Sequence, residues 1–417
     1  MRAKNLPIGF EAIGYEKWTR RATVAAVALF PFVFFPGIEK PFSVPKIVFL
    51  GGLVASVGIF SAITGRFRWP TLSRGGQLSL IAWASALAAS ALCGEFVSTE
   101  ALCLSLFSIV WFLLVMAVAP EPAHIAMAAS VSCAAMAAFA LLQYLGLDPF
   151  SLFGWTTSSY ASPRMRVIGT LGNPNFVAAV LVAGIPLTLH LAKRNKHRTF
   201  LLFATALEVA AVFATGSRAA FVAIIAVLGW FGILGHFARW RSMVAVGLVI
   251  GVLLPLAPSR SLMDTISGRF YIWKVTASHL LERPLTGFGP GAFEPKFIEW
   301  ETAYWRDGRG SAKERQFSGL QAHAHNDYLE ILVDSGVAGA LSGVFLLGVF
   351  FAFAFKRAKS APGGVSAGAS AGVIALAAVA LVDFPLHRPE ALFLLWTLIA
   401  LVYLEAGGER RIVSLQV

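Results

Sequence analysis

Two histidines stand one residue apart in QAHAHNDYLE, residues 321–330, where a long polar segment meets an apolar run. An imidazole titrates near neutral pH, so His323 and His325 are candidates for a general base. The pair alone makes a poor metal chelate, because side chains at positions i and i+2 point to opposite sides of a strand and lie about 200° apart on a helix. The stretch by itself leaves three interpretations open: a catalytic base, a metal ligand or interfacial polar residues.

Arginines near a helix start supply a second kind of chemistry. Arg164 and Arg166 shortly precede the sequence GNPN at 172–175. This sequence is typical of a helix start, because Asn173 can cap the helix and Pro174 suits its first turn. A helix N-terminus that faces out of the membrane beside two arginines can bind an anion. The alternative is a capped helix entry whose arginines only extend to the lipid headgroups.

Two further arginines lie at positions where an unpaired charge would destabilise a membrane protein. Arg218 lies in TGSRAAF, within a very short turn between apolar runs, and a charge near the bilayer is costly unless it is paired or used. Arg269 opens an amphipathic stretch, 269–281, that predicts a short helix along the membrane interface. We expect Arg269 in the first turn of that helix, where the helix dipole disfavours a cation. Both positions indicate a function for the guanidinium, with snorkelling as the alternative for Arg218.

A third short turn, DFPLHRPE at 383–390, adds Asp383, His387 and Arg388. Several guanidiniums with one or two imidazoles suit an anionic phosphate ligand and a proton transfer. They do not suit a divalent-metal glycosyltransferase, which would use paired carboxylates, and the chain contains no Asp-x-Asp sequence. The residues therefore predict an anion site with acid–base chemistry, without a metal or other cofactor.

Membrane helices must position these side chains. Hydrophobic residues make up 57% of the 417 residues and charged residues only 13%, whereas about 25% of a soluble domain is charged. This composition and the positive mean hydropathy predict an all-α polytopic membrane protein. Twelve apolar runs are candidate transmembrane helices: about 22–38, 46–64, 76–94, 101–119, 123–146, 173–192, 199–215, 219–236, 242–257, 327–355, 364–382 and 391–406.

The distribution of Lys and Arg predicts the orientation of these helices. With the N-terminus inside, most basic residues of the short loops fall inside, including the clusters KRNKHR at 193–198 and KRAK at 356–359. Both termini are therefore expected in the cytoplasm, and the basic clusters are expected to meet anionic membrane lipids rather than nucleic acid.

The chain then divides into three parts: helices one to nine over 1–257, one long outside loop with short amphipathic helices over 258–326, and helices ten to twelve with a cytoplasmic tail over 327–417. The tenth run is longer than a bilayer needs, so its first turns are expected outside the membrane. Glu208 stands in the middle of the seventh run, where a carboxylate is protonated, paired or functional. The sequence leaves its role open.

Four motifs occur in the order found in O-antigen ligases: GTLGNPN (169–175), TGSRAAF (215–221), GRFYIWKVTASHLLERPLTGFGPGAF (268–293) and HAHNDYLEILVDSGVAG (323–339). The chain resembles that family, a branch of the superfamily that also contains O-antigen polymerases and bacterial O-oligosaccharyltransferases. The resemblance covers about 170–390, and its strongest element is the His325–Asn326 pair. The residues before about 160 share hydropathy only.

The resemblance implies a metal-independent glycosyltransferase of the bacterial inner membrane, with about twelve helices, a GT-C-like architecture and a periplasmic active site. It would transfer a glycan from undecaprenyl pyrophosphate to a sugar hydroxyl of lipid A–core in lipopolysaccharide assembly. His325 matches the essential histidine of the family and would be the base. Arg218 matches the arginine after the seventh helix and Arg269 the arginine that opens the periplasmic loop. Both would hold the pyrophosphate as it leaves.

Further residues are weaker candidates for substrate contacts: Arg164, Arg166, His323, Asn326, Arg388 and Asp383. Of these, Asp383 would orient an imidazole or an arginine. Attack opposite the leaving group would invert the anomeric centre. An O-antigen polymerase and a protein O-oligosaccharyltransferase of the same superfamily are alternatives that differ in the acceptor. A transporter of lipid-linked glycans would show charged residues inside several helices and an internal repeat, and the sequence shows no repeat.

Overall fold

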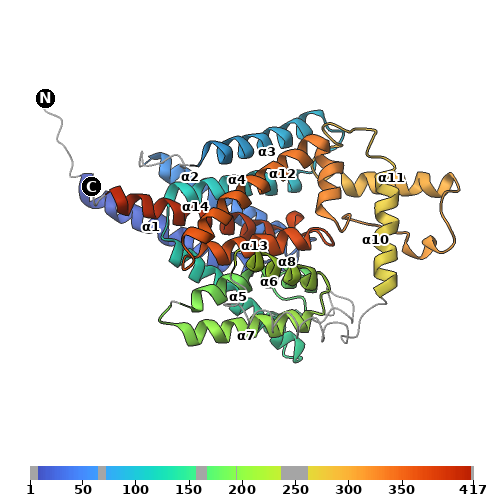
Figure 1. The fold of residues 1–417 in the computed structure, drawn as a ribbon. Helices are drawn as coiled ribbons and strands as arrows, with labels where there is room; N and C mark the ends of the chain where they lie inside the picture. Colours follow the sequence, from blue (N-terminus) through green and yellow to red (C-terminus); the bar gives the residue numbers. More distant parts are fainter. Residues whose placement is uncertain (1–7, 64–71, 156–166, 194, 236–261, 415–417) are drawn as a thin grey trace.

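The computed structural model describes residues 8–63, 72–155, 167–193, 195–235 and 262–414, and within these ranges the chain forms helices and connecting segments without a β-strand. The helices of the main bundle are α1 (Ile8–Leu29), α2 (Val44–Ile63), α3 (Arg74–Cys93), α4 (Thr99–Val118), α5 (Pro122–Tyr144), α6 (Pro174–Ala192), α7 (Arg198–Thr215), α8 (Ala219–Ile233), α12 (Asp327–Ser360), α13 (Ser366–Val379) and α14 (Pro389–Ser414). Two more, α10 (Leu262–Ala277) and α11 (Phe293–Arg306), lie at the end of the bundle opposite the chain termini (Figure 1).

Eleven of the twelve predicted apolar runs overlap a helix of the bundle, and the ninth run, 242–257, lies outside the described residues. The first run, 22–38, is placed wrongly, because α1 extends from Ile8 to Leu29 and the chain leaves the α-helix there. Seven of the described helices are long and apolar enough to cross a membrane. Three shorter apolar helices accompany them: α8, α13 and the stretch Val44–Ile59 of α2. The all-helical membrane architecture is thus confirmed for the described residues, whereas the count of twelve spans remains a prediction.

The centre of the bundle is the contact between α6 and α13, with α14 packed beside α13. Nearly every side chain of α6 and α13 is buried. Small residues allow this approach, because a Cβ at Gly368 would lie 2.8 Å from the carbonyl oxygen of Pro186, and one at Gly372 would meet that of Ala183. Membrane helices associate through such residues, since lipid supplies no hydrophobic driving force between helices. This centre carries the turn between α13 and α14, on which Asp383 lies.

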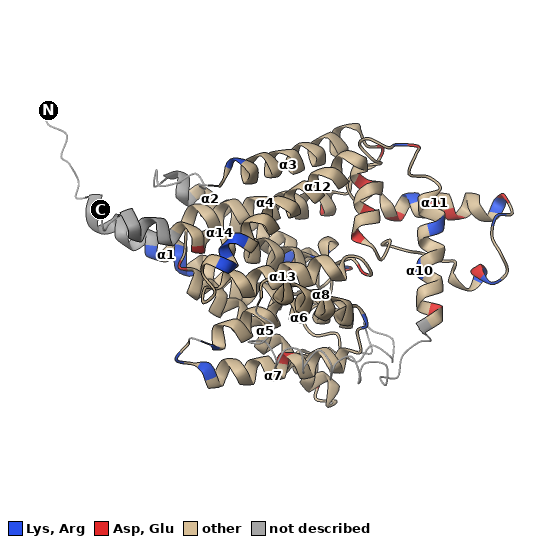
Figure 2. Cartoon of the chain, in the orientation of Figure 1, with Lys and Arg blue, Asp and Glu red and all other residues tan. Residues whose placement is uncertain are grey.

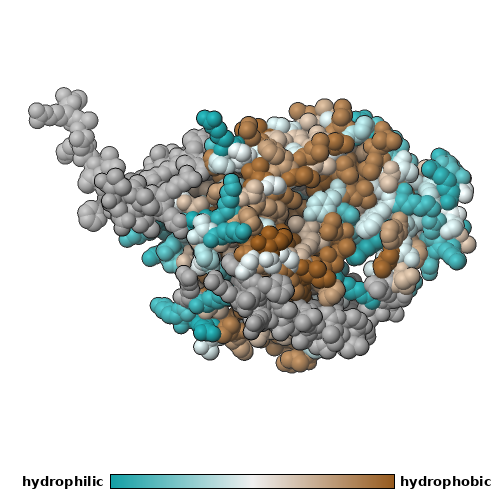
Figure 3. Space-filling view, in the orientation of Figure 1, coloured by the Kyte–Doolittle hydropathy of each residue, from teal (hydrophilic) through white to brown (hydrophobic). Residues whose placement is uncertain are grey.

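Polar and apolar residues are separated along the length of the bundle. Apolar side chains cover much of the middle of the visible face, and hydrophilic ones lie toward its two ends (Figure 3). Among the residues that Figure 2 colours, Lys and Arg gather toward the end of the bundle nearest the chain termini, whereas residues of both signs occur around α10 and α11. This distribution agrees with a bilayer around the middle of the bundle.

α10 and α11 form a small unit of their own at the end of the bundle. α10 runs across the ends of the bundle helices, and α11 extends away from them (Figure 1). Their shared core consists of Tyr271, Ile272, Val275, Phe288, Phe293, Phe297, Trp300 and Tyr304. The short helices expected in the long loop are therefore present.

The expectation that Arg269 lies in a first helical turn is wrong. α10 begins at Leu262, so Arg269 lies in the middle of the helix. The first turn instead contains Asp264, whose carboxylate the helix dipole favours at that position. The helix therefore starts upstream of the arginine, and Arg269 follows Thr265 by about one turn, on the same face.

α12 is interrupted at Gly336, whose backbone (φ 61°, ψ −163°) is not helical. The break separates the first turns of α12, residues 327–335, from its long apolar part. That these first turns lie outside the membrane remains a prediction. A turn from the long loop packs into the break: the amide of Phe288 donates to the carbonyl of Val333 (2.8 Å), and that of Gly289 to the carbonyl of Asp334 (2.9 Å). The first turns of α12 are thereby fixed against the loop.

Candidate active site

His325 stands at the entrance to α12 in an uncommon backbone conformation. Its φ of 50° lies in the left-handed region, which few residues other than glycine adopt. The next residue, Asn326, caps the helix, because its side-chain oxygen accepts a hydrogen bond from the amide of Leu329 (3.1 Å). Strained backbone positions such as that of His325 cluster at functional sites.

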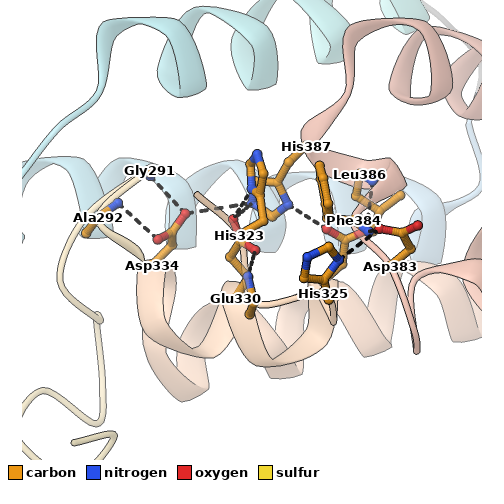
Figure 4. Close-up of polar contacts among 12 residues, drawn as sticks. Gly291, Ala292, His323, His325, Glu330, Asp334, Asp383, Phe384, Leu386 and His387 are labelled. Atoms are coloured by element: carbon orange, nitrogen blue, oxygen red, sulfur yellow. Dashed lines mark hydrogen bonds and ion pairs between the residues drawn. The ribbon is translucent and has the colours of Figure 1, made fainter. Parts of the chain in front are cut away.

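Asp383 is the carboxylate partner of His325. His325 Nδ1 lies 3.3 Å from Asp383 Oδ1, and the aspartate is buried while the imidazole is partly exposed (Figure 4). The amide of Phe384 also donates to Asp383 Oδ1 (3.1 Å), and the Phe384 ring meets the imidazole edge-on, with 5.1 Å between ring centres. When Nδ1 carries its proton toward the carboxylate, Nε2 is the nitrogen that accepts a proton. The arrangement is that of a general base oriented by an acid.

Two guanidiniums lie near this pair. Burial lowers the pKa of Arg269, the Asp383 carboxylate raises it, and the Arg218 guanidinium lowers it, so all three side chains share one electrostatic environment. Arg218 Nη1 lies 3.4 Å from Thr265 Oγ1, one turn before Arg269 on α10. An arginine stays protonated under physiological conditions. The structure thus pairs His325 with Asp383, and Arg269 lies within electrostatic range of both Asp383 and Arg218.

A second imidazole, His387, lies among three buried carboxylates. It belongs to the single-turn helix η7 (Pro385–His387). Its Nδ1 lies 2.5 Å from Asp327 Oδ1, and its Nε2 lies 3.6 Å from Glu330 Oε1 and 3.8 Å from Asp334 Oδ2. Burial by itself lowers the pKa of His387, but the three carboxylates raise it well above its usual value. His387 is therefore an imidazolium held by the first turns of α12.

His323 connects this cluster with Phe384. Its Nδ1 lies 2.8 Å from Glu330 Oε1, and its ring stacks on Phe384 with 4.0 Å between ring centres. Phe384 therefore lies between the rings of His323 and His325 (Figure 4). The two histidines of the QAHAHNDYLE stretch thus face different surroundings: His325 pairs with Asp383, and His323 joins the His387 cluster.

One ligand atom each of His323, Glu330 and His387 lie within 4.8 Å of one another, a spacing that a metal ion can bridge. Glu330 and His387 thus lie where they could complete a metal site with His323, which the His-Ala-His sequence alone could not form. Hydrogen bonds already reach both oxygens of Glu330, from His323 and from the amide of Ala324. Both oxygens of Asp334 likewise accept amides of the loop turn. Protein donors therefore account for the cluster, and the expectation of no metal remains a prediction.

Sequence reasoning missed Asp327, Glu330 and Asp334 as members of the site. Their spacing of i, i+3 and i+7 places them on one face of a helix, and this was the available signal. Because these three carboxylates fall inside an apolar run, a hydropathy profile alone does not reveal them. Their joint partner, His387, is 53 to 60 residues away in sequence, and no local pattern connects the two segments.

A cavity of about 650 Å³ opens beside the His387 cluster. Its polar end includes His323, His387 and Arg388, and apolar side chains of α3, α4, α12 and α14 form its walls, among them Trp83, Leu104, Leu347 and Trp396. The described lining residues include Phe384, which contacts His325, but neither His325 nor Asp383. Arg388 lies with its guanidinium 4.2 Å from the ring centre of Phe176 and its Nε 3.5 Å from Glu390 Oε1.

The other residues predicted from the sequence belong to the helices α6 and α7 or lie outside the described residues. Arg164 and Arg166 lie outside the described residues. The helix start at GNPN is confirmed, because Asn173 caps α6 by accepting a hydrogen bond from the amide of Asn175 (2.8 Å) and Pro174 is its first residue. Glu208 is buried inside the bundle, where the hydroxyl of Thr188 donates to its Oε1 (3.0 Å).

The fold and the site are those of a multi-pass helical membrane protein with a histidine–aspartate pair and arginines at one end of the bundle. Residues 200–344 match the family model of the O-antigen ligases, so the family resemblance expected from the motifs is confirmed. The matched segment contains Arg218, Arg269 and both histidines of the QAHAHNDYLE stretch. Members of this family are glycosyltransferase-like enzymes that work on lipid-linked glycans and lipid acceptors. No curated protein matches the chain.

Proposed function

We propose that the protein is an O-antigen ligase of the bacterial inner membrane. It transfers a glycan from undecaprenyl pyrophosphate to a sugar hydroxyl of lipid A–core, on the periplasmic side. The observation that carries the proposal is the pairing of His325 with Asp383 (3.3 Å), with Arg269 within electrostatic range of Asp383 and of Arg218. A base with its orienting acid beside two cations suits the transfer of a group from a pyrophosphate.

His325 Nε2 accepts the proton of the acceptor hydroxyl as its oxygen attacks the anomeric carbon. The new carbon–oxygen bond forms as the bond from that carbon to the pyrophosphate oxygen breaks, and undecaprenyl pyrophosphate leaves with the electron pair. Arg218 and Arg269 stabilise the negative charge that the leaving group gains. Asp383 holds the imidazole in the tautomer that accepts at Nε2 and stabilises the imidazolium that forms. Attack from the side opposite the leaving group inverts the anomeric centre.

The cavity beside the cluster supports a lipid substrate. Its walls are largely apolar, while Arg388 and His323 stand at its polar end. In this proposal both residues contact phosphate or sugar groups of a substrate, as do Asn326 and, from outside the described residues, Arg164 and Arg166. No step of the transfer needs a metal ion, because the two arginines supply the positive charge.

The gathering of Lys and Arg near the ends of α1 and α14 supports cytoplasmic termini. The site lies at the other end of the bundle, where α10 and α11 are located (Figure 1). This arrangement supports a periplasmic site that lipid-linked substrates reach from the outer leaflet.

The proposal is tested with purified protein, lipid-linked O-antigen and lipopolysaccharide that lacks O-antigen. Glycosylated lipopolysaccharide should form in the presence of a chelator and should be lost in His325→Ala. The matched control is His124→Ala, which removes an exposed imidazole in the first turn of α5. No product with this acceptor would refute the ligase assignment. Longer lipid-linked glycans formed without lipopolysaccharide would identify a polymerase instead.

A further inference from the structure

Asp327 and His387 flank the pair that the proposed mechanism uses. Asp327 follows His325 by two residues, and His387 follows Asp383 by four. The two pairs therefore connect the same two segments of the chain, the entrance to α12 and the α13–α14 turn. One pair, His325–Asp383, is partly open to solvent, and the other, Asp327–His387, is mostly buried.

Asp327 binds the α13–α14 turn on both sides of Asp383. Before it, the Asp327 amide donates to the carbonyl of Ala380 (2.9 Å). After it, the amide of Leu386 donates to Asp327 Oδ2 (2.8 Å), and His387 Nδ1 lies 2.5 Å from Asp327 Oδ1. One residue at the start of α12 thus fixes both ends of the short stretch that carries the orienting acid.

The surroundings of His387 make this attachment costly to break. Asp327 and Glu330 are almost fully buried, and Asp334 is anchored by the amides of Gly291 and Ala292. If His387 leaves, carboxylates stay buried without their cationic partner, which costs far more than the loss of an exposed ion pair. The turn therefore has one strongly preferred position relative to the entrance of α12.

We propose that Asp327 and His387 are positioning residues for transfer: they hold Asp383 at the distance from which it orients His325. This inference rests on the proposed function, because it assigns His325 as the base. A displacement of about 1 Å in a catalytic group can cost about 100-fold in rate. The contact between His325 Nδ1 and Asp383 is already long, at 3.3 Å, so a small shift of the turn would end it.

Two substitutions of His387 separate the bond to Asp327 from the rest of the side chain. In His387→Asn the amide nitrogen takes the place of Nδ1 and keeps a donor for Asp327. In His387→Gln the amide nitrogen reaches the place of Nε2 and leaves Asp327 without that donor. We expect His387→Gln to lower kcat by about 100-fold with little change in KM for the donor, and His387→Asn to restore part of the loss. Equal losses in both variants would overturn the inference.

A double-mutant cycle distinguishes positioning from a general loss of stability. In an Asp383→Asn background, His387→Gln should have little further effect on kcat, because the oriented acid is already lost. A merely structural role predicts the same fold-loss in both backgrounds, and that result would contradict the inference. Folding of each variant is checked by its unfolding transition, and Asp327→Asn serves as a milder change if His387→Gln does not fold.

A structural readout tests the positioning without relying on activity. In a cryo-EM map of His387→Gln, the distance between His325 Nδ1 and Asp383 should exceed hydrogen-bonding reach. An unchanged distance would overturn the inference even if the ligase assignment stands. An active His325→Ala variant would instead overturn the proposed base, whichever distance is found. The failure of the positioning role and the failure of the proposed function are therefore distinguishable.

Discussion

Gly336→Ala should destabilise the protein strongly, because the break in α12 depends on this glycine. The backbone of Gly336 (φ 61°, ψ −163°) lies in a region that is essentially restricted to glycine. A Cβ there would lie 2.5 Å from the carbonyl carbon and oxygen of Leu285. The Leu285 carbonyl cannot simply withdraw, since it accepts a hydrogen bond from the amide of Ala338 (3.1 Å).

Backbone strain of this kind costs about 1–3 kcal/mol, and forcing an atom into a packed contact costs a similar amount. We therefore expect the free energy of unfolding to fall by at least about 2 kcal/mol. If α12 straightens to avoid the strain, residues 327–335 rotate relative to the loop turn and the carboxylates leave His387. The variant should then lose transferase activity as well as stability.

The matched control is Gly348→Ala in the same helix. A Cβ at Gly348 meets no atom within 4 Å, and alanine is favoured over glycine inside a helix by about 0.5–1 kcal/mol. The two variants should thus change stability in opposite directions. Their free energies of unfolding are compared by SDS titration in mixed micelles, with tryptophan fluorescence as the probe. If Gly336→Ala proves as stable as Gly348→Ala, the reasoning about the break is wrong.

Three more predictions concern the site. Asp334→Asn leaves one of the amides of Gly291 and Ala292 without an acceptor, so the free energy of unfolding should fall by about 1–3 kcal/mol. The control Asp307→Asn, at an exposed ion pair, should lower it by less than about 1 kcal/mol, and similar losses in both variants would contradict the prediction. Asp327, Glu330 and Asp334 raise the pKa of His387 above the usual imidazole pKa of 6.5. The positive charge of His387 therefore stabilises the fold fully below pH 6.5, and this stabilisation is lost as the pH rises through the raised pKa. The stability gap between the wild type and His387→Asn should therefore narrow at alkaline pH, and a gap that widens there would refute the assignment. Arg218→Ala and Arg269→Ala should each lower kcat by about 100- to 1000-fold, whereas Arg306→Ala on exposed α11 should not, and near wild-type turnover in either site variant would remove its assigned role.

Much of the helical framework was predictable from the sequence, because a helix that crosses a bilayer needs a long apolar run. The start of α6 was predictable as well, since Asn173 and Pro174 carry a local capping signal. The start of α10 was not, because the apolar spacing after Arg269 hid the turns before it. Local signals thus located helix starts only where a capping residue marks them.

The site itself was only partly predictable. The motifs indicated His325, Arg218 and Arg269, and the turn at 383–390 suggested that Asp383 orients an imidazole or arginine; the structure places it beside His325. The buried cluster around His387 was not foreseen, because it depends on contacts between segments more than 50 residues apart. The break at Gly336 also requires knowledge of the loop that packs into it. Tertiary contacts decide these features, and no local pattern encodes them.

The long sequence separations within the site determine when it can form during biosynthesis. Ser90 on α3 donates to the carbonyl of Asp334 across 244 residues, and Arg283 bonds the carbonyl of Cys93 across 190. Helices that are synthesised early, such as α3, therefore cannot form these contacts until segments that are translated much later have been made. Asp383 and His387 are supplied by the turn before the last helix. A nascent or truncated chain that lacks the turn between α13 and α14 thus contains His325 and both arginines but neither Asp383 nor His387, so the proposed site cannot form before this turn has been translated.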